Sequence, residues 1–195
     1  MAVITHFSEL DLTKEYTFSD YLQWQFSERV ELLKGFIKQM SPAPSRRHQT
    51  VSRNLSGIFY NILYKKTCNF FSAPFDVRLP IASAKRETTV VQPDLCIICD
   101  ESKLDDYGCN GAPDLIVEIV SPNNSKYDVD TKFRLYQEAG VMEYWIVQTE
   151  MKTVLVYRLQ DGVYVGSKPF AEGEIIESSL FPEMKIAVDE VFYRV

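Results

Sequence analysis

The spacing of apolar positions changes along the chain, and each spacing predicts a different kind of element. Between residues 45 and 66 the apolar side chains recur every three or four positions, which predicts one amphipathic helix. Residues 95–99 and 115–120 are instead short, continuous apolar runs, and residues 144–147 form another. Such runs are typical of strands that are covered on both faces. The pattern therefore predicts central strands with helices packed against them.

Turn and capping residues divide the N-terminal half further. Thr17 and Asp20 have the spacing of a capping box, which predicts a short helix after Thr17. Residues 29–33 and 36–40 read as two strands joined by a tight turn at Lys34-Gly35. Further strands are expected at 68–71 and 75–79, on either side of Pro74, and a polar connection at 81–89.

The C-terminal half predicts one more helix and a hairpin. Ser125 can cap a helix that runs to about Ala139 and stops at Gly140, since glycine suits the position after a helix end. Residues 154–158 and 163–165 predict an antiparallel hairpin around Asp161-Gly162. A short strand near 184–186 and a final helical turn are expected in the tail, whereas 100–110 reads as a polar connection.

Length and composition favour one globular domain spanning residues 1–195. The chain has 195 residues, 46% of them apolar, and its apolar runs are far shorter than the roughly 20 residues of a membrane span. The first residues lack the pattern of a signal peptide, so we expect a cytoplasmic protein. The net charge of −6 argues weakly against a broad nucleic-acid surface but leaves room for a local basic cleft.

The four cysteines are expected to be buried, reduced thiols. Cys96 and Cys99 form a C-x-x-C pair, but they lie in a strand pattern, where positions three apart face opposite sides. They are therefore poorly placed to hold one metal ion, and a zinc site needs four convergent ligands. Cys68 and Cys109 stand apart from them in sequence.

Three acids stand in or beside apolar strands: Glu31, Asp94 and Glu118. Glu118 lies inside the run 115–120, where an ionised group is costly without a metal ion, an ion pair or a raised pKa. An acid at the start of one strand and another within its neighbour can converge on Mg²⁺, which prefers carboxylate oxygens, water and phosphate. Such a metal polarises a phosphate and activates an attacking water.

A lysine beside these acids would help by stabilising negative charge or orienting the water. Two residues after Glu118, on the same strand face, stands Val120, which carries no charge. Lys132 is the next candidate, because it lies about 60° from the apolar stripe of the following helix. From there it can point toward the sheet edge.

The stretches that carry a family resemblance are Val91-Gln92-Pro93-Asp94-Leu95, Gly111-Ala112-Pro113-Asp114-Leu115-Ile116-Val117-Glu118-Ile119-Val120-Ser121-Pro122, Lys132-x-x-x-Tyr136, Gly140-Val141-x-Glu143-Tyr144-Trp145-Ile146-Val147 and, upstream, Val30-Glu31-Leu32-Leu33-Lys34-Gly35 and Met40-Ser41-Pro42-Ala43-Pro44 followed by His48. Together they resemble the Uma2 family of restriction endonucleases, in the PD-(D/E)xK nuclease superfamily. The similarity covers roughly residues 29–147. Its most specific part is the run from Pro113 to Pro122.

The resemblance implies an α/β, restriction-endonuclease-like fold: a mixed central β-sheet flanked by α-helices, here with an added β-hairpin. It implies Asp94 and Glu118 as ligands of Mg²⁺ or Mn²⁺, and Lys132 in place of the lysine usually found two positions after the glutamate. Glu31 matches an additional acid from the N-terminal part. The implied activity is hydrolysis of DNA phosphodiester bonds. The Ile119 carbonyl is expected to join the metal ligands.

His48 is a candidate substrate contact at a helix start, where backbone N–H groups favour phosphate. A homodimer is expected by analogy with other nucleases of this superfamily. Each site residue also has a structural explanation that competes with these roles: a turn residue for Asp94, a helix-surface pair with Asp128 for Lys132, a cross-strand pair with Lys38 for Glu31, and a solvated position for His48. Asp114 is expected to be a turn residue.

Two other functions are open to the same sequence. A non-catalytic nucleic-acid-binding or protein-interaction module that keeps the fold is favoured by Val120 and by the acidic net charge. A metal-dependent hydrolase of a small phosphorylated molecule would need a closed pocket. No helix-turn-helix or zinc-finger signature indicates which DNA sequence is recognised.

Overall fold

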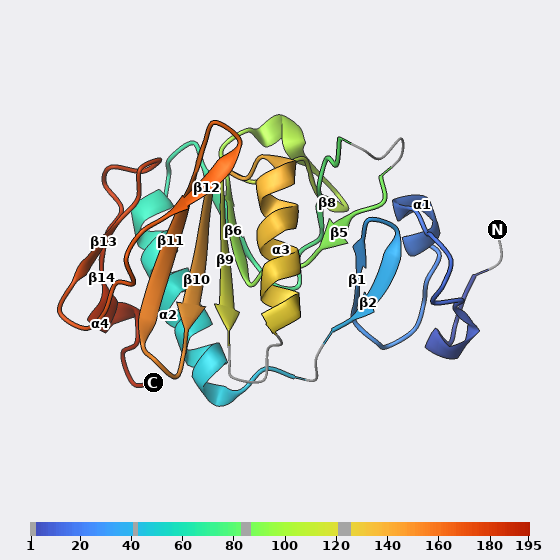
Figure 1. Cartoon of the computed structure of the whole chain (residues 1–195), viewed down its shortest axis with the longest axis horizontal. Coiled ribbons are helices and arrows are strands. Elements are labelled where there is room, and N and C mark those ends of the chain that lie inside the picture. Colours follow the sequence, from blue (N-terminus) through green and yellow to red (C-terminus); the bar gives the residue numbers. More distant parts are fainter. Residues whose placement is uncertain (1–2, 41–42, 83–86, 121–125) are drawn as a thin grey trace.

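The structure, a computed structural model, describes residues 3–40, 43–82, 87–120 and 126–195, with side chains from residue 129 onward in the last range. A mixed six-stranded sheet forms its centre (Figure 1). Its strands, in spatial order, are β12 (Val163–Gly166), β11 (Thr153–Gln160), β10 (Glu143–Gln148), β9 (Leu115–Val120), β6 (Leu95–Ile98) and β3 (Asn69–Ser72). β9 and β10 are parallel, whereas their outer neighbours are antiparallel. The predicted mixed central sheet is confirmed.

Two helices cover opposite faces of this sheet (Figure 1). α2 (Arg46–Leu63) begins where the Ser45 hydroxyl accepts the His48 backbone N–H. Its predicted apolar stripe, including Val51, Leu55 and Phe59, is buried against the sheet. α3 (Lys126–Ala139) packs on the other face and ends at Gly140, whose φ is +85°. Ser125, the predicted cap, lies outside the described residues.

A second six-stranded sheet holds the N-terminal hairpin. Its strands, in order, are β2 (Phe36–Gln39), β1 (Val30–Leu33), β5 (Val90–Val91), β4 (Val77–Arg78), β8 (Gly108–Asn110) and β7 (Leu104–Asp105). The turn at Lys34-Gly35 and the pairing of β1 with β2 are as predicted. Residues 104–110, expected to be a plain polar connection, instead form the hairpin β7–β8. Glycine at 108 allows it, because an added Cβ would meet the Asp76 carbonyl at 2.1 Å.

Short elements complete the two ends of the chain. The N-terminal part contains η1 (Phe7–Glu9) and α1 (Phe18–Tyr21), and Thr17 and Asp20 form the predicted capping box. η2 (Glu101–Lys103) follows β6. The tail forms β13 (Ile175–Glu177), β14 (Lys185–Ala187) and α4 (Val188–Val191), which cover the α2 side of the central sheet. The tail strand and final turn were predicted; the partner strand β13 was not.

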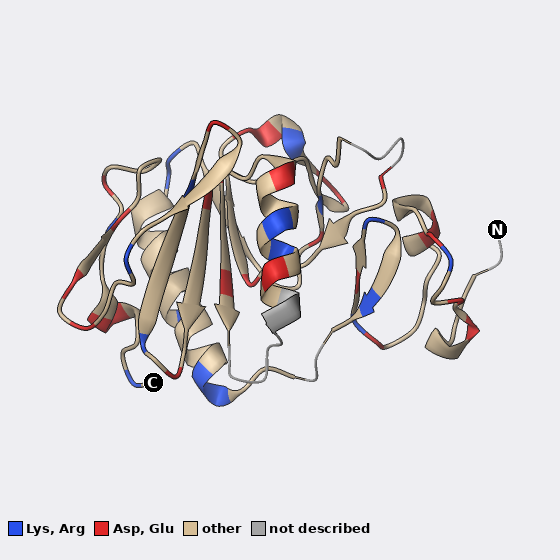
Figure 2. Cartoon of the chain, in the orientation of Figure 1, with Lys and Arg blue, Asp and Glu red and all other residues tan. Residues whose placement is uncertain are grey.

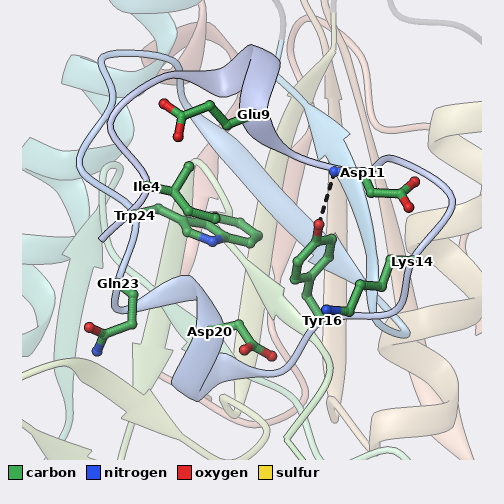
Figure 3. Close-up of a pocket in the computed structure, with 8 residues that line it drawn as sticks. All are labelled: Ile4, Glu9, Asp11, Lys14, Tyr16, Asp20, Gln23 and Trp24. Carbon is green, nitrogen blue, oxygen red and sulfur yellow. Dashed lines mark hydrogen bonds between the residues drawn. The ribbon is translucent and has the colours of Figure 1, made fainter. Parts of the chain in front are cut away.

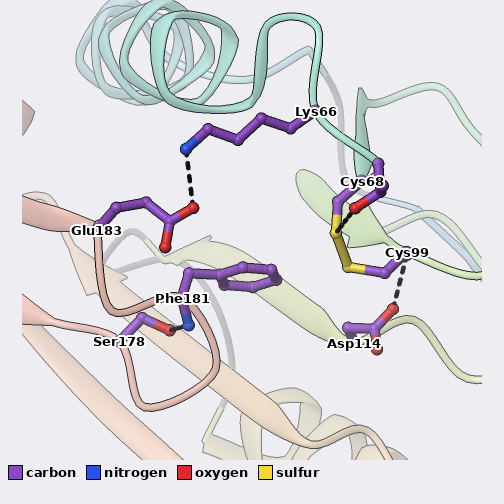
Figure 4. Close-up of a disulfide and its surroundings, with 8 residues drawn as sticks. Lys66, Cys68, Cys99, Asp114, Ser178, Phe181 and Glu183 are labelled. Atoms are coloured by element: carbon purple, nitrogen blue, oxygen red, sulfur yellow. Dashed lines mark hydrogen bonds and ion pairs between the residues drawn. A yellow bond between two sulfur atoms is a disulfide. The ribbon is translucent and has the colours of Figure 1, made fainter.

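The prediction of four reduced cysteines is wrong. Cys68, just before β3, is bonded to Cys99, just after β6, in a disulfide (Figure 4). The two strands are antiparallel neighbours with Asn69 opposite Ile98, so the next pair outward is 68 and 99. Cys96 and Cys109 are free and buried. Cys96 and Cys99 do face opposite sides of the sheet, as strand geometry requires.

Candidate active site

Asp94 and Glu118 come together because β6 and β9 run antiparallel. Leu95 pairs with Val117, so Asp94 stands opposite Glu118 at the end of the paired segment. The Ile119 backbone N–H donates to Oδ2 of Asp94 at 2.7 Å. The carboxyl group of Asp94 therefore lies against the neighbouring strand β9, beside Glu118 and Ile119.

Glu118 lies on the face of β9 that α3 covers. Residues 116 and 120 belong to the core on the α3 side, whereas 115, 117 and 119 belong to the core on the α2 side. Alternation along the strand gives Glu118 and Val120 the same face. The position that would carry a lysine two residues after Glu118 is thus filled by a valine packed under α3.

Lys132 reaches Glu118 from α3. Its Nζ lies 2.9 Å from Oε1 of Glu118, and the lysine side chain is 17% exposed. One helical turn later the Tyr136 hydroxyl donates to the same oxygen at 2.6 Å. Lysine and tyrosine four positions apart lie on one helix face, so one face of α3 supplies both partners.

Glu31 brings the N-terminal hairpin to the same lysine. Its Oε1 lies 3.0 Å from Nζ of Lys132 and accepts the Gln92 backbone N–H at 2.9 Å. Glu31 also stands opposite Lys38 in the hairpin register, as the alternative interpretation required. Lys132 is therefore shared between two buried carboxylates that come from different sheets.

His48 is not a solvated helix-start residue. Its Nε2 lies 3.2 Å from Oδ1 of Asp94, its side chain is 14% exposed, and its buried Nδ1 has no hydrogen-bond partner within the described residues. The first turn of α2 thus contacts Asp94 through the His48 side chain. The sequence placed His48 at the helix start but gave no sign of this contact.

Burial and neighbouring charges shift the pKa values of these groups. Burial raises the pKa of Glu118 to about 7; Asp94 and Glu31 add to the rise, and Lys132 and Tyr136 oppose it. Burial would lower the pKa of Lys132, but Glu118 and Glu31 together hold it well above the ordinary lysine value. Burial likewise opposes protonation of His48, yet Asp94 raises its pKa overall. Lys132 is a permanent cation here.

The other acids near these strands have structural partners or lie outside the described residues. Asp114 accepts the Cys99 backbone N–H and is a turn residue, as expected. Asp76 accepts hydrogen bonds from Tyr21 and Gln92. Arg78 pairs with Asp105. The side chain of Asp128, the alternative partner of Lys132, lies outside the described residues.

Tyr136 is the site residue that sequence reasoning missed. Helical periodicity assigns it to the buried stripe of α3, and it is indeed fully buried. A tyrosine in a wholly buried stripe needs a partner for its hydroxyl, and that need was the available signal.

The donor set fits a hard divalent cation. Asp94 and Glu118 supply carboxylate oxygens from adjacent strands, and Ile119 is held against Asp94. Magnesium commonly uses one or two carboxylates and completes its shell with water and phosphate. Within the described part of the chain, no three His, Cys, Asp or Glu side chains form a closed ligand cage, as a structural metal would require.

A cavity of about 410 Å³ lies elsewhere, in the N-terminal segment (Figure 3). It is lined by Ile4, Glu9, Asp11, Lys14, Tyr16, Asp20, Gln23 and Trp24. These residues include none of the candidate site residues, so the cavity adds nothing to the chemistry of the acids and Lys132. Among the described residues, no helix is long and apolar enough to cross a membrane.

A mixed sheet flanked by helices, with two acids on adjacent strands and a lysine beside them, defines a restriction-endonuclease-like protein. The model of the Uma2 family, described as "putative restriction endonuclease", matches residues 18–189. The chain belongs to the Uma2 family.

The chain is also similar to two Synechocystis proteins and to one solved structure. The Synechocystis protein slr1290, described as uncharacterized, is 29% identical over 147 residues, 73% of this chain and 74% of its own length. The Synechocystis protein sll1609, also described as uncharacterized, is 26% identical over 168 residues, 84% of this chain and 89% of its own. A crystal structure from Anabaena variabilis, described as a putative nuclease of DUF820, matches with a TM-score of 0.69. It is 19% identical and covers 91% of this chain and 97% of its own, which establishes the shared fold.

Proposed function

We propose that this protein is a metal-dependent endonuclease that hydrolyses phosphodiester bonds in DNA. The observation that carries the proposal is the convergence of Asp94, Glu118 and Lys132 at one edge of the central sheet, with Lys132 2.9 Å from Glu118. Burying charged acids and a lysine costs free energy unless each charge has a partner of opposite sign, and here the lysine and the acids are partners. Membership of a family described as restriction endonucleases supports the same activity.

Asp94, Glu118 and the Ile119 carbonyl are the proposed ligands of Mg²⁺, with Mn²⁺ as a substitute. A divalent cation at this position would polarise the phosphate and lower the pKa of the attacking water. Asp94 is suited to a ligand role because the Ile119 N–H and His48 fix both of its oxygens. Its carboxyl group therefore loses little freedom when it binds.

Lys132 is proposed to orient the attacking water and to stabilise negative charge on the phosphate. Its high pKa keeps it protonated, so it acts as a hydrogen-bond donor and not as a base. Glu118 and Glu31 engage two of the three N–H groups of its ammonium, and the third, which no acceptor among the described residues engages, is proposed to serve the reaction. Glu31 holds the lysine in place.

His48 is proposed to contact the substrate. Its raised pKa favours the imidazolium form, which attracts phosphate, and it sits in the first turn of α2, where backbone N–H groups add to the attraction. A neighbouring phosphate of the strand is the group that this arrangement suits.

The test is cleavage of supercoiled plasmid and single-stranded DNA with Mg²⁺ or Mn²⁺, comparing wild type with Glu118→Ala and Lys132→Ala. We expect nicking that requires the metal and falls by at least about a hundredfold in both variants. Cleavage that survives in Lys132→Ala alone would remove the lysine from the mechanism. A wild type that binds DNA but never cuts it would favour a non-catalytic module.

The proposal extends to assembly and location. Two copies acting together would cut both strands of a duplex, so a homodimer is proposed, to be tested by sedimentation with and without DNA. A cytoplasmic location is also proposed, to go with DNA as the proposed substrate.

A further inference from the structure

The segment around α2 is basic in an acidic protein. Residues 45–66 contain five lysines or arginines and no acid, although the whole chain carries a net charge of −6. Figure 2 shows basic residues at the first turn of α2, and the helix sequence contains no acidic residue. Two of the five, Arg47 and Lys66, pair with Glu150 and Glu183 from other segments, so the local positive charge is smaller than the count suggests. Local positive charge can still attract polyanions when the net charge repels them.

The solvent-facing side of α2 carries a single stripe of basic and aromatic residues. At roughly 100° per residue, five positions fall within about 60° of one another, diametrically opposite the buried stripe around Leu55. They are Arg46, Arg53, Gly57, Tyr60 and Tyr64. We call this stripe the outer face of α2.

Two tyrosines at the far end of this face are exposed and adjacent. Tyr60 is 54% exposed and Tyr64 is 56% exposed, and their ring centroids lie 5.2 Å apart. Lys65 lies over the Tyr64 ring at 5.2 Å from its centroid. Exposed tyrosines beside cations are the groups on which single-stranded bases stack.

The first turn of α2 carries Arg46 of the outer face, and it also reaches the candidate active site through His48 on the opposite side of the helix. His48, in the first turn of α2, is 3.2 Å from Asp94. The helix has 18 residues, so at about 1.5 Å per residue its outer face extends for about 27 Å away from the acids. A strand leaving the site toward α2 meets Arg46 first, then Arg53, then the two tyrosines.

We propose that the outer face of α2 binds a single-stranded nucleic-acid segment that continues from the active site. Arg46 and Arg53 contact its phosphates, and Tyr60 and Tyr64 stack against its bases. The inference rests on the proposed function, because it takes nucleic acid as the substrate. It adds that the preferred substrate carries an unpaired strand beside the cleaved bond.

A protein partner is the other class of ligand that exposed tyrosines attract. The absence of acids from residues 45–66 favours nucleic acid, since lysine and arginine without acids beside them suit a chain of phosphates. The two classes predict different responses to salt and to single charges placed on this face.

Gly57 allows a sharp test in the middle of the outer face. A Cβ at this position meets nothing within 4 Å, and glycine is a poor helix former, so any replacement should preserve or improve folding. Binding of a labelled oligothymidine of about 20 nucleotides is measured by fluorescence anisotropy in EDTA, which stops cleavage. The variants are Gly57→Glu, Gly57→Lys and the neutral control Gly57→Gln.

We expect Gly57→Glu to weaken binding about fivefold relative to Gly57→Gln, and Gly57→Lys to strengthen it. The double variant Tyr60→Ala/Tyr64→Ala should lose about tenfold or more, whereas the control Tyr107→Ala, an exposed tyrosine on the β7–β8 turn, should lose nothing. Arg53→Ala should lower the slope of log affinity against log salt by about 0.7.

Unchanged affinity in Gly57→Glu and in the double tyrosine variant would overturn the proposal. A second result would also overturn it: wild type self-associates in sedimentation, and Gly57→Glu abolishes this self-association but leaves the affinity for DNA unchanged. If wild type binds the strand through this face but cuts no DNA, the nuclease proposal fails and this one stands. If wild type cuts DNA and the outer-face variants bind the single strand as tightly as wild type does, the nuclease proposal stands and the proposal for the outer face fails.

Discussion

The Tyr136 hydroxyl donates a hydrogen bond to the same Glu118 oxygen that the Lys132 ammonium contacts, at 2.6 Å and 2.9 Å. Both donors come from α3, one turn apart, and both reach across to β9. The orientation of the Glu118 carboxyl group is therefore fixed by the helix and not by its own strand. A shift of α3 would move the acid and the lysine together.

Replacing Tyr136 with phenylalanine should loosen Glu118 without opening a large cavity. The change removes one hydrogen bond to a buried carboxylate, which is worth on the order of 2 kcal/mol. We expect the free energy of unfolding to fall by about that amount and the affinity for Mn²⁺ to fall severalfold. Urea denaturation and isothermal titration of Mn²⁺ measure the two effects.

Tyr157→Phe is the matched control, because its ring, like that of Tyr136, packs against Tyr144, but Tyr157 is not part of the Glu118 site. It should change neither quantity by much. Equal effects of the two substitutions would mean that Tyr136 contributes only packing.

Replacing Lys132 with methionine should destabilise the metal-free protein. The substitution keeps the apolar stem and removes the cation that lies within 3.0 Å of both Glu118 and Glu31. Two buried acids without a counter-charge cost roughly 3–5 kcal/mol. Urea denaturation in EDTA at pH 8 gives the change.

Adding Glu31→Gln to Lys132→Met should restore part of the lost stability, because one of the two uncompensated charges disappears. A double variant that is no more stable than the single one would show that the cluster is not held by charge balance. Arg134→Met, on the exposed side of α3 with its partner Asp130, is a control that should cost less than about 1 kcal/mol.

Stability should depend on pH through Glu118. Its folded pKa, about 7, lies above the ordinary value of 4.5, so the folded protein binds this proton more tightly than the unfolded chain does. The stabilisation from Glu118 is complete below pH 4.5 and is lost as the pH rises through 7. Its loss amounts to on the order of 3 kcal/mol.

Denaturant unfolding of the metal-free protein between pH 5 and pH 8 measures this slope. Glu118→Gln should flatten the profile in that window, while Glu150→Gln, an exposed acid paired with Arg47, should leave it unchanged. An identical slope in wild type and Glu118→Gln would show that burial does not raise this pKa.

Much of the site could be predicted because its acids lie in strongly patterned strands. The continuous apolar run around Glu118 predicted both the strand and its unusual acid, and the fold followed from the same periodicities. Lys132 was harder, since no local rule places a helix residue against a particular strand residue. The helical periodicity placed Lys132 beside the buried apolar stripe of α3, so it predicted a side chain directed toward the sheet edge but not its partner on the sheet.

The remaining contacts depend on how distant segments pair. His48 contacts Asp94 because the first turn of α2 lies beside the start of β6, and nothing in either segment's sequence indicates that contact. Cys68 meets Cys99 because β3 and β6 pair with Asn69 opposite Ile98. A register shift of one residue would separate the two sulfur atoms, and hydrophobic patterning does not specify register that finely at a sheet edge.

Reducing the Cys68–Cys99 disulfide should lower stability without abolishing the fold. The bond closes a loop with a sequence separation of 31 residues, and crosslinks of this length contribute about 3 kcal/mol by restricting the unfolded chain. The sheet pairing of β3 with β6 and the core under them remain when the bond is broken, so the reduced protein should stay folded at room temperature. Urea denaturation with and without a phosphine reductant gives the difference.

Cys68→Ser should match the reduced wild type and respond no further to reductant, whereas Cys109→Ser should keep the response, because Cys109 is free and lies in the other core. Titration of thiols in the unfolded chain should find two without reductant and four with it. Four thiols in the untreated protein would contradict the disulfide and restore the expectation of reduced cysteines.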